Sequence, residues 1–144
     1  MKYLAFALGL LSVLFVVSCE KEDIHDDDHG TNYEYHAHII SPTTDAKHLN
    51  DTISIKVDFE SHTGETVHHI NVKIFNKLDS TIVYNMPTEA HVHSSGSYSH
   101  EDNLILSDRN GFSGHSDWIM EARVWGHEAG EEEVLERLEF HVHP

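Results

Sequence analysis

Histidines recur in this sequence at spacings that allow two of them to share one ion. The chain has 15 histidines in 144 residues, and they include three His-x-His triplets, at His36–His38, His91–His93 and His141–His143. In an extended strand, residues i and i+2 lie on one face about 6–7 Å apart, so both imidazoles of a triplet can approach one ion. Neutral imidazole suits zinc, copper(II) and nickel(II). The triplets therefore predict binding of a divalent transition metal, although each one alone also fits polar alternation on a solvated strand.

The segments that position these histidines alternate with a period of two, which indicates strands. The clearest case is 52–59, where Ile53, Ile55, Val57 and Phe59 share one face and polar residues occupy the other. With turn residues between them, strands are predicted at 33–40, 52–59, 69–75, 80–85, 97–106, 117–126 and 136–143. Seven short strands without a helix of useful length predict a two-sheet antiparallel sandwich.

One segment allows a second interpretation. Residues 131–138 are rich in helix formers, so a turn of helix before the last strand is an alternative. The unbroken alternation up to His143 favours a strand from about Val134.

The first 18 residues are typical of a secretory signal peptide. Lys2 is followed by a run from Tyr3 to Val17 that is apolar except for Ser12, too short to span a bilayer comfortably. The run ends in Ser18-Cys19, which resembles the bacterial lipoprotein box, where a cysteine after a small residue is acylated. Cys19 is the only cysteine of the chain, so the mature protein is expected to have no disulfide.

The residues after the cysteine carry a second resemblance. The sequence Lys21-Glu22-Asp23 is similar to the surface-export signal of Bacteroidetes lipoproteins. This resemblance implies a lipid anchor on Cys19, location at the outer membrane and exposure on the cell surface. The acidic segment 19–31 has too few apolar residues to fold by itself and is predicted to be a flexible tether. The organisation expected is thus a signal peptide at 1–18, a tether at 19–31 and one folded domain at 32–144.

The net negative charge of the chain restricts the classes of molecule that it can bind. Loss of the signal peptide leaves 8 Lys and Arg against 25 Asp and Glu, a formal charge of about −17. Such a charge argues against nucleic acid and against an anionic membrane surface, and it favours cations. The lipid on Cys19 is the expected link to a membrane.

The domain also resembles a known group. The segments Ile39–Pro42, Leu49–Ile55 and Trp118–Trp125, with a closing strand at the end of the chain, are similar to the immunoglobulin-like modules of bacterial surface proteins. The resemblance implies a seven-stranded immunoglobulin-like β-sandwich that binds a partner with its loops, here without the paired cysteines of antibody domains. Fold alone does not determine function.

This topology divides the histidines between two poles. The start of the first strand and the connections after the second, fourth and sixth strands lie at one pole. The candidate metal ligands predicted there are His36, His38, His62, His68, His69, His91, His93, His100 and His127. Glu60, Glu65, Glu89 and Glu128 lie in or beside the same connections and could complete a coordination shell. The remaining four, His48, His115, His141 and His143, are expected near the other pole.

Three functions fit these residues. The first is a surface-tethered module that captures or buffers a divalent metal, or delivers it to an outer-membrane importer or another surface protein. Zinc is favoured over copper(II) or nickel, and binding should weaken below about pH 6.5 as imidazoles protonate. The second is an adhesion module that contacts a glycan or protein through aromatic residues such as Tyr98 or Trp125. The third is a small metallohydrolase.

Catalytic motifs do not support the third function. The sequence has no Gly-x-Ser-x-Gly, no His-Glu-x-x-His and no glycine-rich phosphate loop. Ser113, His115 and Asp117 lie close together, but they lack the turn that exposes a nucleophile. A protein without enzymatic activity is therefore expected.

Overall fold

The computed structural model describes residues 35–87, 91–127 and 133–144. They lie within one compact unit, Thr31–Pro144. Their strands are β1 (Tyr35–Ser41), β2 (Lys47–His48), β3 (Thr52–Ser61), β4 (Thr66–Asn76), β5 (Ile82–Met86), β6 (His91–Ser95), β7 (Ser97–Ile105), β8 (Ser116–Trp125) and β9 (Val134–His143), with one 3-10 helix, η1 (Asp108–Asn110). Among these residues no helix is long and apolar enough to cross a membrane. The predicted signal peptide, Cys19 and the tether up to residue 31 fall outside the described part.

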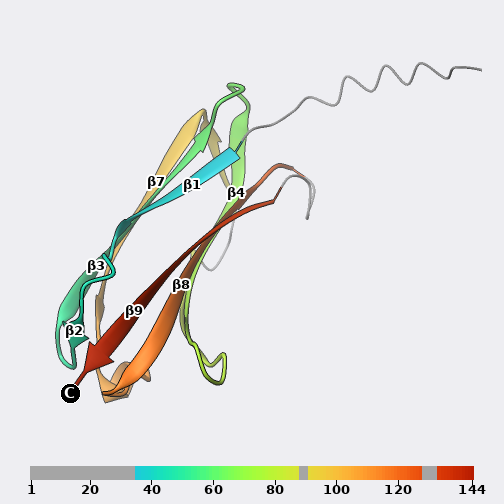
Figure 1. Cartoon of the computed structure of the whole chain (residues 1–144). Helices are drawn as coiled ribbons and strands as arrows, with labels where there is room; N and C mark the ends of the chain where they lie inside the picture. Colours follow the sequence, from blue (N-terminus) through green and yellow to red (C-terminus); the bar gives the residue numbers. More distant parts are fainter. Residues whose placement is uncertain (1–34, 88–90, 128–132) are drawn as a thin grey trace, which may run out of the picture. The chain divides into compact units, whose positions relative to one another are not determined.

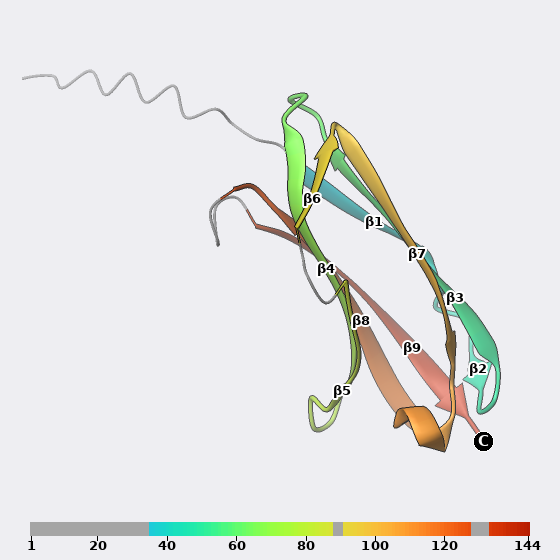
Figure 2. The same cartoon turned by 180° about the vertical axis from the view of Figure 1, so that it is seen from behind.

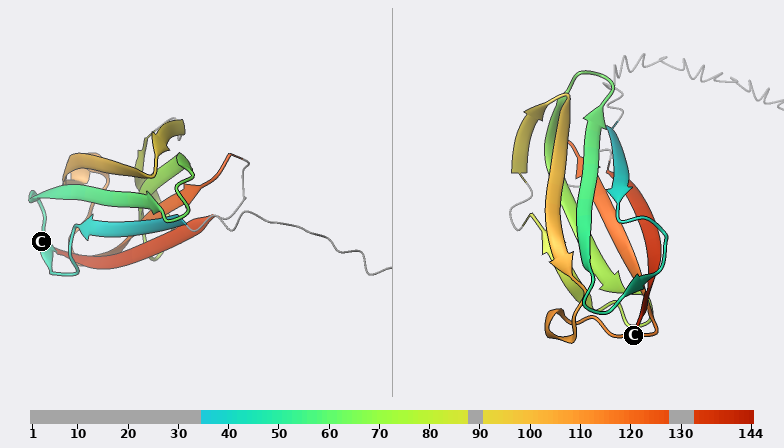
Figure 3. Two further views of the ribbon diagram at one scale, coloured as in Figure 1. Left: turned by 90° about the horizontal axis from the view of Figure 1, so that it is seen from above. Right: turned by 90° about the vertical axis from the view of Figure 1, so that its left-hand side faces the viewer.

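The strands form two sheets that face each other (Figures 1 and 2). One sheet has the order β1-β3-β7, and the other has the order β2-β9-β8-β4-β5, with β6 also pairing with β4. The right-hand view in Figure 3 looks onto the first sheet, with the orange and red strands of the second behind it. The predicted two-sheet sandwich is confirmed.

Burial follows the predicted alternation on both sheets. On β3, the four residues Ile53, Ile55, Val57 and Phe59 are buried, as expected from the sequence. From the facing sheet, the buried residues include Val67, Ile70, Val72, Ile74, Trp118, Met120, Ala122, Val124, Phe140 and Val142. Burial of these apolar side chains is the main stabilising contribution to the sandwich.

The outer face of the second sheet holds one buried charge. Glu121 is only 2% exposed, and its carboxylate accepts hydrogen bonds from Nε of Arg123 (2.6 Å) and Nε of Arg137 (2.9 Å). The ammonium of Lys73 lies 3.4 Å away. Burial acts to raise the pKa of Glu121, but the hydrogen bonds from the arginines and the nearby positive charges outweigh it and lower the pKa. This network joins β4, β8 and β9.

Two strands were not predicted. β6 pairs with the first part of β4, and the two-residue β2 runs parallel to β9, whereas the sequence indicated only antiparallel pairs. The strand predicted at 80–85 is β5, and it pairs with the second half of β4. One edge of β4 is therefore shared by two short strands.

The last strand begins at Val134, so the helical alternative is wrong from that residue on.

Candidate metal centres

A β-bulge brings histidines of β4 and β6 to one place. The register between these strands shifts between Val67 and His69, so that His68 on β4 faces both Val92 and His93 on β6. His93 has a φ of 48°, in the left-handed region that few non-glycine residues adopt. Bulges bend a strand and redirect its side chains. The local structure thus directs the imidazole of His93 toward β4.

Three imidazoles converge at this bulge. His68, His91 and His93 each offer one nitrogen, and these atoms all lie within 4.8 Å of one another. Their ring centroids are 4.3 Å apart for His68 and His91, 4.3 Å for His68 and His93, and 4.0 Å for His91 and His93. Tetrahedral zinc, with Zn–N of about 2.0–2.1 Å, needs nitrogens about 3.3–3.4 Å apart. Small side-chain rotations would bring these three residues, the first histidine triad, to that spacing.

Two more histidines adjoin the first histidine triad. The ring of His69 lies 4.8 Å from that of His68 and 4.6 Å from that of His91, and it stacks on Trp125 at 5.2 Å. Adjacent residues of a regular strand point to opposite faces, so the closeness of His68 and His69 reflects the bulge. His127, just beyond β8, places its Nδ1 atom 3.1 Å from Nε2 of His68.

The state of His68 suits a metal ligand. Its Nδ1 atom is buried and has no hydrogen-bond partner among the described residues. A buried polar atom without a partner costs about 1–3 kcal/mol, and a bound ion is one of the features that explain such an atom. Burial, followed by the neighbouring histidines, lowers the pKa of His68, and burial together with His91 lowers the pKa of His69. Both imidazoles are therefore neutral at pH 7, the form that binds metal.

Three of the predicted ligands gather on the other sheet instead. His36 and His38 project from β1, with rings 6.0 Å apart, and the ring of His62 lies 4.2 Å from that of His36. Glu60 places a carboxylate oxygen 3.5 Å from Nε2 of His62. These residues belong to neither group of three histidines whose nitrogens come within 4.8 Å of one another. The predicted carboxylates Glu89 and Glu128 lie outside the described residues.

His100 has a different environment. Its Nε2 atom lies 2.9 Å from the hydroxyl of Tyr84, which donates a hydrogen bond to Oδ2 of Asp102 at 2.9 Å. Because that hydroxyl has one proton, Nε2 of His100 must be the donor in the first bond. Burial lowers the pKa of His100, and Asp102 opposes the effect. In the described part of the chain, the ring of His100 contacts no other histidine, which sets it apart from the first histidine triad.

A second group of histidines lies near the end of β9 and was not predicted as a site. The nitrogens of His115, His141 and His143 also lie within 4.8 Å of one another. The triplet at 141–143 was visible in the sequence. The approach of His115, from the residue before β8, depends on the pairing of β8 with β9, and no sequence spacing reveals it.

The aromatic residues of the adhesion hypothesis have structural contacts. Tyr98 is partly buried and packs against the core. Trp125 stacks on His69 with an angle of 14° between the rings. One face of each side chain is thus engaged within the domain.

Comparison with known proteins identifies the class of fold. No family model matches the sequence, and no curated protein is similar to it. The solution structure of a CARDB domain from Pyrococcus furiosus is similar, with a TM-score of 0.52 and 12% identity over 77% of this chain and 95% of that chain. A crystal structure of that CARDB domain in complex with di-metal ions has a TM-score of 0.50 and 13% identity over 76% and 93%. The domain is an immunoglobulin-like β-sandwich, as predicted.

Proposed function

We propose that this domain binds a divalent transition metal at the first histidine triad, with His127 or His69 as a further ligand. The observation that carries the proposal is the convergence of His68, His91 and His93, whose nitrogens lie within 4.8 Å of one another. The buried, unpartnered Nδ1 atom of His68 adds a second reason. An ion at this position would connect β4 to β6.

The ligand set suits zinc, copper(II) and nickel, and we favour zinc because three or four imidazoles fit its tetrahedral coordination. The triad provides nitrogen ligands and no thiolate, which suits borderline divalent ions and disfavours copper(I). The formal charge of −16 attracts cations to the surface. A CARDB domain of similar fold was crystallised in complex with di-metal ions, which agrees with a metal-binding role. We propose a binding module without catalytic activity.

Calorimetric titration tests the proposal. All described strands and the complete core lie in Thr31–Pro144, so this domain, prepared without an affinity tag, is titrated with zinc, copper(II) and nickel at pH 7.4. We expect stoichiometric zinc binding tighter than micromolar. The H91A/H93A double variant should lose the ion bound at the triad.

The chain offers a matched control for this experiment. The H36A/H38A double variant removes the same number of imidazoles from another His-x-His triplet, on β1. It should bind as the wild type does. Equal losses in both double variants, or only weak binding at many positions, would show that the histidines act as a solvated surface.

We also propose that a lipid on Cys19 anchors the domain at the outer membrane, exposed on the cell surface, where it captures or buffers metal. Support comes from the apolar run of residues 3–17, its ending in Ser18-Cys19 and the acidic residues that follow. Mass spectrometry of the mature protein should find an acylated N-terminal cysteine. The C19S variant should lose the lipid and its membrane association, and protease added to intact cells should remove the wild-type domain.

A further inference from the structure

The second group of histidines lies far along β4, β8 and β9 from the first triad. His141 and His143 project from the end of β9 with ring centroids 4.6 Å apart. The ring of His115 lies 6.5 Å from that of His141 and 6.3 Å from that of His143. Three nitrogens of this group, the second histidine triad, come within 4.8 Å of one another. Alternation along one exposed strand would bring only His141 and His143 together, and it would not bring His115 to them.

A close backbone contact holds His115 beside β9. A Cβ atom on Gly114 would lie 3.1 Å from Cα of Pro144, so the absence of a side chain allows the two segments to touch. His115 itself has a φ of 55°. This left-handed conformation turns the chain directly before β8, and both features place the imidazole next to the end of β9.

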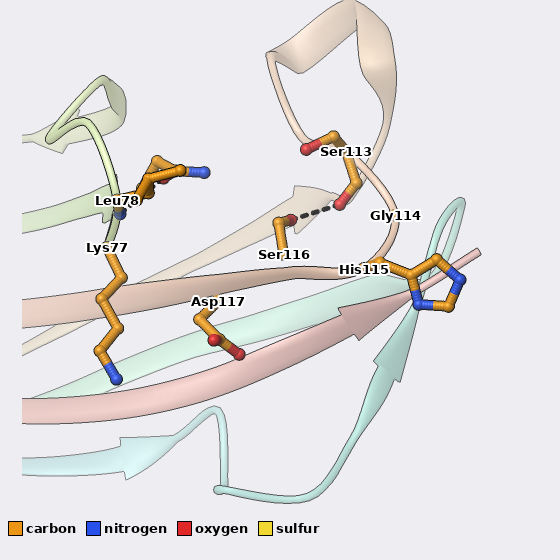
Figure 4. Close-up of a pocket in the computed structure, with 8 residues that line it drawn as sticks. Lys77, Leu78, Ser113, Gly114, His115, Ser116 and Asp117 are labelled. Carbon is orange, nitrogen blue, oxygen red and sulfur yellow. Dashed lines mark hydrogen bonds between the residues drawn. The ribbon is translucent and has the colours of Figure 1, made fainter.

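The turn that carries His115 is fixed to the core. The indole Nε1 of Trp118, which is buried, donates a hydrogen bond to Oγ of Ser116 at 2.7 Å. The hydroxyl of Ser116 in turn donates to the carbonyl of Ser113 (Figure 4). The bond between Ser116 and Ser113 spans the position of His115, and the bond from Trp118 ties Ser116 to the core. A ligand held on such a turn needs little reorganisation to bind.

Asp117 gives His141 the environment of a metal ligand. Its Oδ1 atom lies 2.7 Å from Nδ1 of His141. A carboxylate that accepts the proton of one ring nitrogen fixes the tautomer and leaves Nε2 free, and it makes the imidazole a stronger ligand. In the described part of the chain, no carboxylate lies within hydrogen-bond distance of the first histidine triad, so the two triads differ chemically.

A fourth histidine is within reach. β2 runs parallel to β9 with His48 opposite His143, and their ring centroids are 5.5 Å apart. The amide of Leu49 donates to the carbonyl of His143 at 2.8 Å, which fixes this pairing. Four imidazoles from three separate segments would match the coordination number of zinc.

The site borders a cavity. His115 and Asp117 are among the residues that line this cavity of about 600 Å³, and Lys77 and Leu78 line it as well. Figure 4 shows the ring of His115 turned away from Lys77 and Leu78, toward the end of β9. The cavity wall therefore supplies the backbone that positions the ligands.

We propose that His115, His141 and His143 form a second, independent site for a divalent transition metal, with His48 as fourth ligand and Asp117 as a positioning residue for His141. The site goes beyond the proposed function, because it shares no residue with the first histidine triad and does not depend on it.

The number of zinc ions bound per chain tests this proposal. The tag-free domain is loaded with zinc, and native mass spectrometry counts the ions while calorimetry gives the affinities. We expect two ions for the wild type, one for H143Q, one for H91A/H93A and none for the combined variant. H143Q is chosen because it leaves the Asp117–His141 pair intact, and circular dichroism of the metal-free protein confirms that each variant folds.

Two further variants test the residues that position the ligands of the second site. D117N retains all imidazoles, and we expect it to weaken the second site about 10–100-fold without changing the first. G114A should weaken the same site by displacing His115. Two ions retained by H143Q would overturn the second site, as would one ion in the wild type that H91A/H93A removes. One ion that H143Q removes and H91A/H93A retains would instead overturn the first site and support the second.

Discussion

Nε2 of His68 and Nδ1 of His127 lie 3.1 Å apart, although 59 residues separate them in the chain. One of the two nitrogens carries the shared proton, and the other accepts it. The contact joins the start of β4 to the segment just after β8. In the proposed metal site, this contact would position His68, or His127 would turn toward the ion and join its coordination shell.

The contact predicts that H127A weakens zinc binding at the first histidine triad about 10–100-fold, the usual effect of removing a residue that orients a ligand. Calorimetry at pH 7.4 measures the change. H62A is the control, because His62 lies beside Glu60 at the end of the other sheet, and it should bind as the wild type does. An unchanged affinity in H127A would show that His127 has no role at the site.

The stability of the metal-free domain should fall with pH below about 6.5. Burial, as the largest cause, lowers the pKa of His68, His69 and His100 in the folded state. Below the pKa of the unfolded chain, about 6.5 for histidine, the unfolded state binds protons that the folded state does not. This contribution to stability is complete above pH 6.5 and is lost as the pH falls toward the lower folded values.

Urea unfolding with a chelator present, between pH 5 and 8, measures this dependence. H100N should show a shallower loss than the wild type, because it removes one of the three groups. A free energy of unfolding that rises as the pH drops from 7 to 5.5 would contradict the prediction.

Glu121 should contribute more to stability than any exposed acidic residue. E121Q removes the negative charge that Arg123, Arg137 and Lys73 share, and we expect a loss of about 1–3 kcal/mol in the free energy of unfolding. The three cations are partly exposed and remain hydrated, which keeps the loss below that of a fully buried pair. Urea unfolding gives the value.

E139Q provides the comparison for E121Q. Glu139 pairs with Lys77 at 2.5 Å, but both side chains are 49% exposed. An exposed pair contributes about 0–1 kcal/mol, so E139Q should be nearly neutral. If E121Q and E139Q lowered the free energy of unfolding by similar amounts, the buried network would stabilise the domain no more than an exposed ion pair does.

Y84F should destabilise the domain without changing metal binding. Tyr84 is 8% exposed, and its hydroxyl bonds both His100 and Asp102. Its loss removes the hydroxyl that pairs with Nε2 of His100 and Oδ2 of Asp102, at a cost of about 1–2 kcal/mol. Thermal unfolding and the zinc stoichiometry are measured on the same samples. If Y84F bound one ion fewer than the wild type, His100 would have to be considered a metal ligand, as the sequence predicted.

The alternation of apolar residues predicted most of the fold. Ile53, Ile55, Val57 and Phe59 face the core because a period of two leaves one arrangement that buries all four. β6 was missed because its sequence, HVHSS, has one apolar residue and no strand pattern. β2 has only two residues, and its parallel pairing with β9 joins segments that are far apart in the sequence.

The candidate sites were only partly predictable, because some of their histidines are brought together by a bulge and by strand pairing rather than by regular alternation. The spacing of His91 and His93 indicated that they share a face, and the predicted topology placed them at the same pole as His68 and His69. The bulge that gathers His68 and His69 breaks the alternation on which such reasoning depends. The place of His115 beside His141 follows from pairing across the sheet, which no local pattern contains.

Each triad contains one histidine in a left-handed conformation, His93 with a φ of 48° and His115 with a φ of 55°. Glycine adopts this conformation without the steric cost of about 1–2 kcal/mol that side chains incur there. Selection for heat resistance in the absence of metal should therefore enrich H93G and H115G. Selection for metal retention should reject both, so the two pressures act in opposite directions at the same two positions.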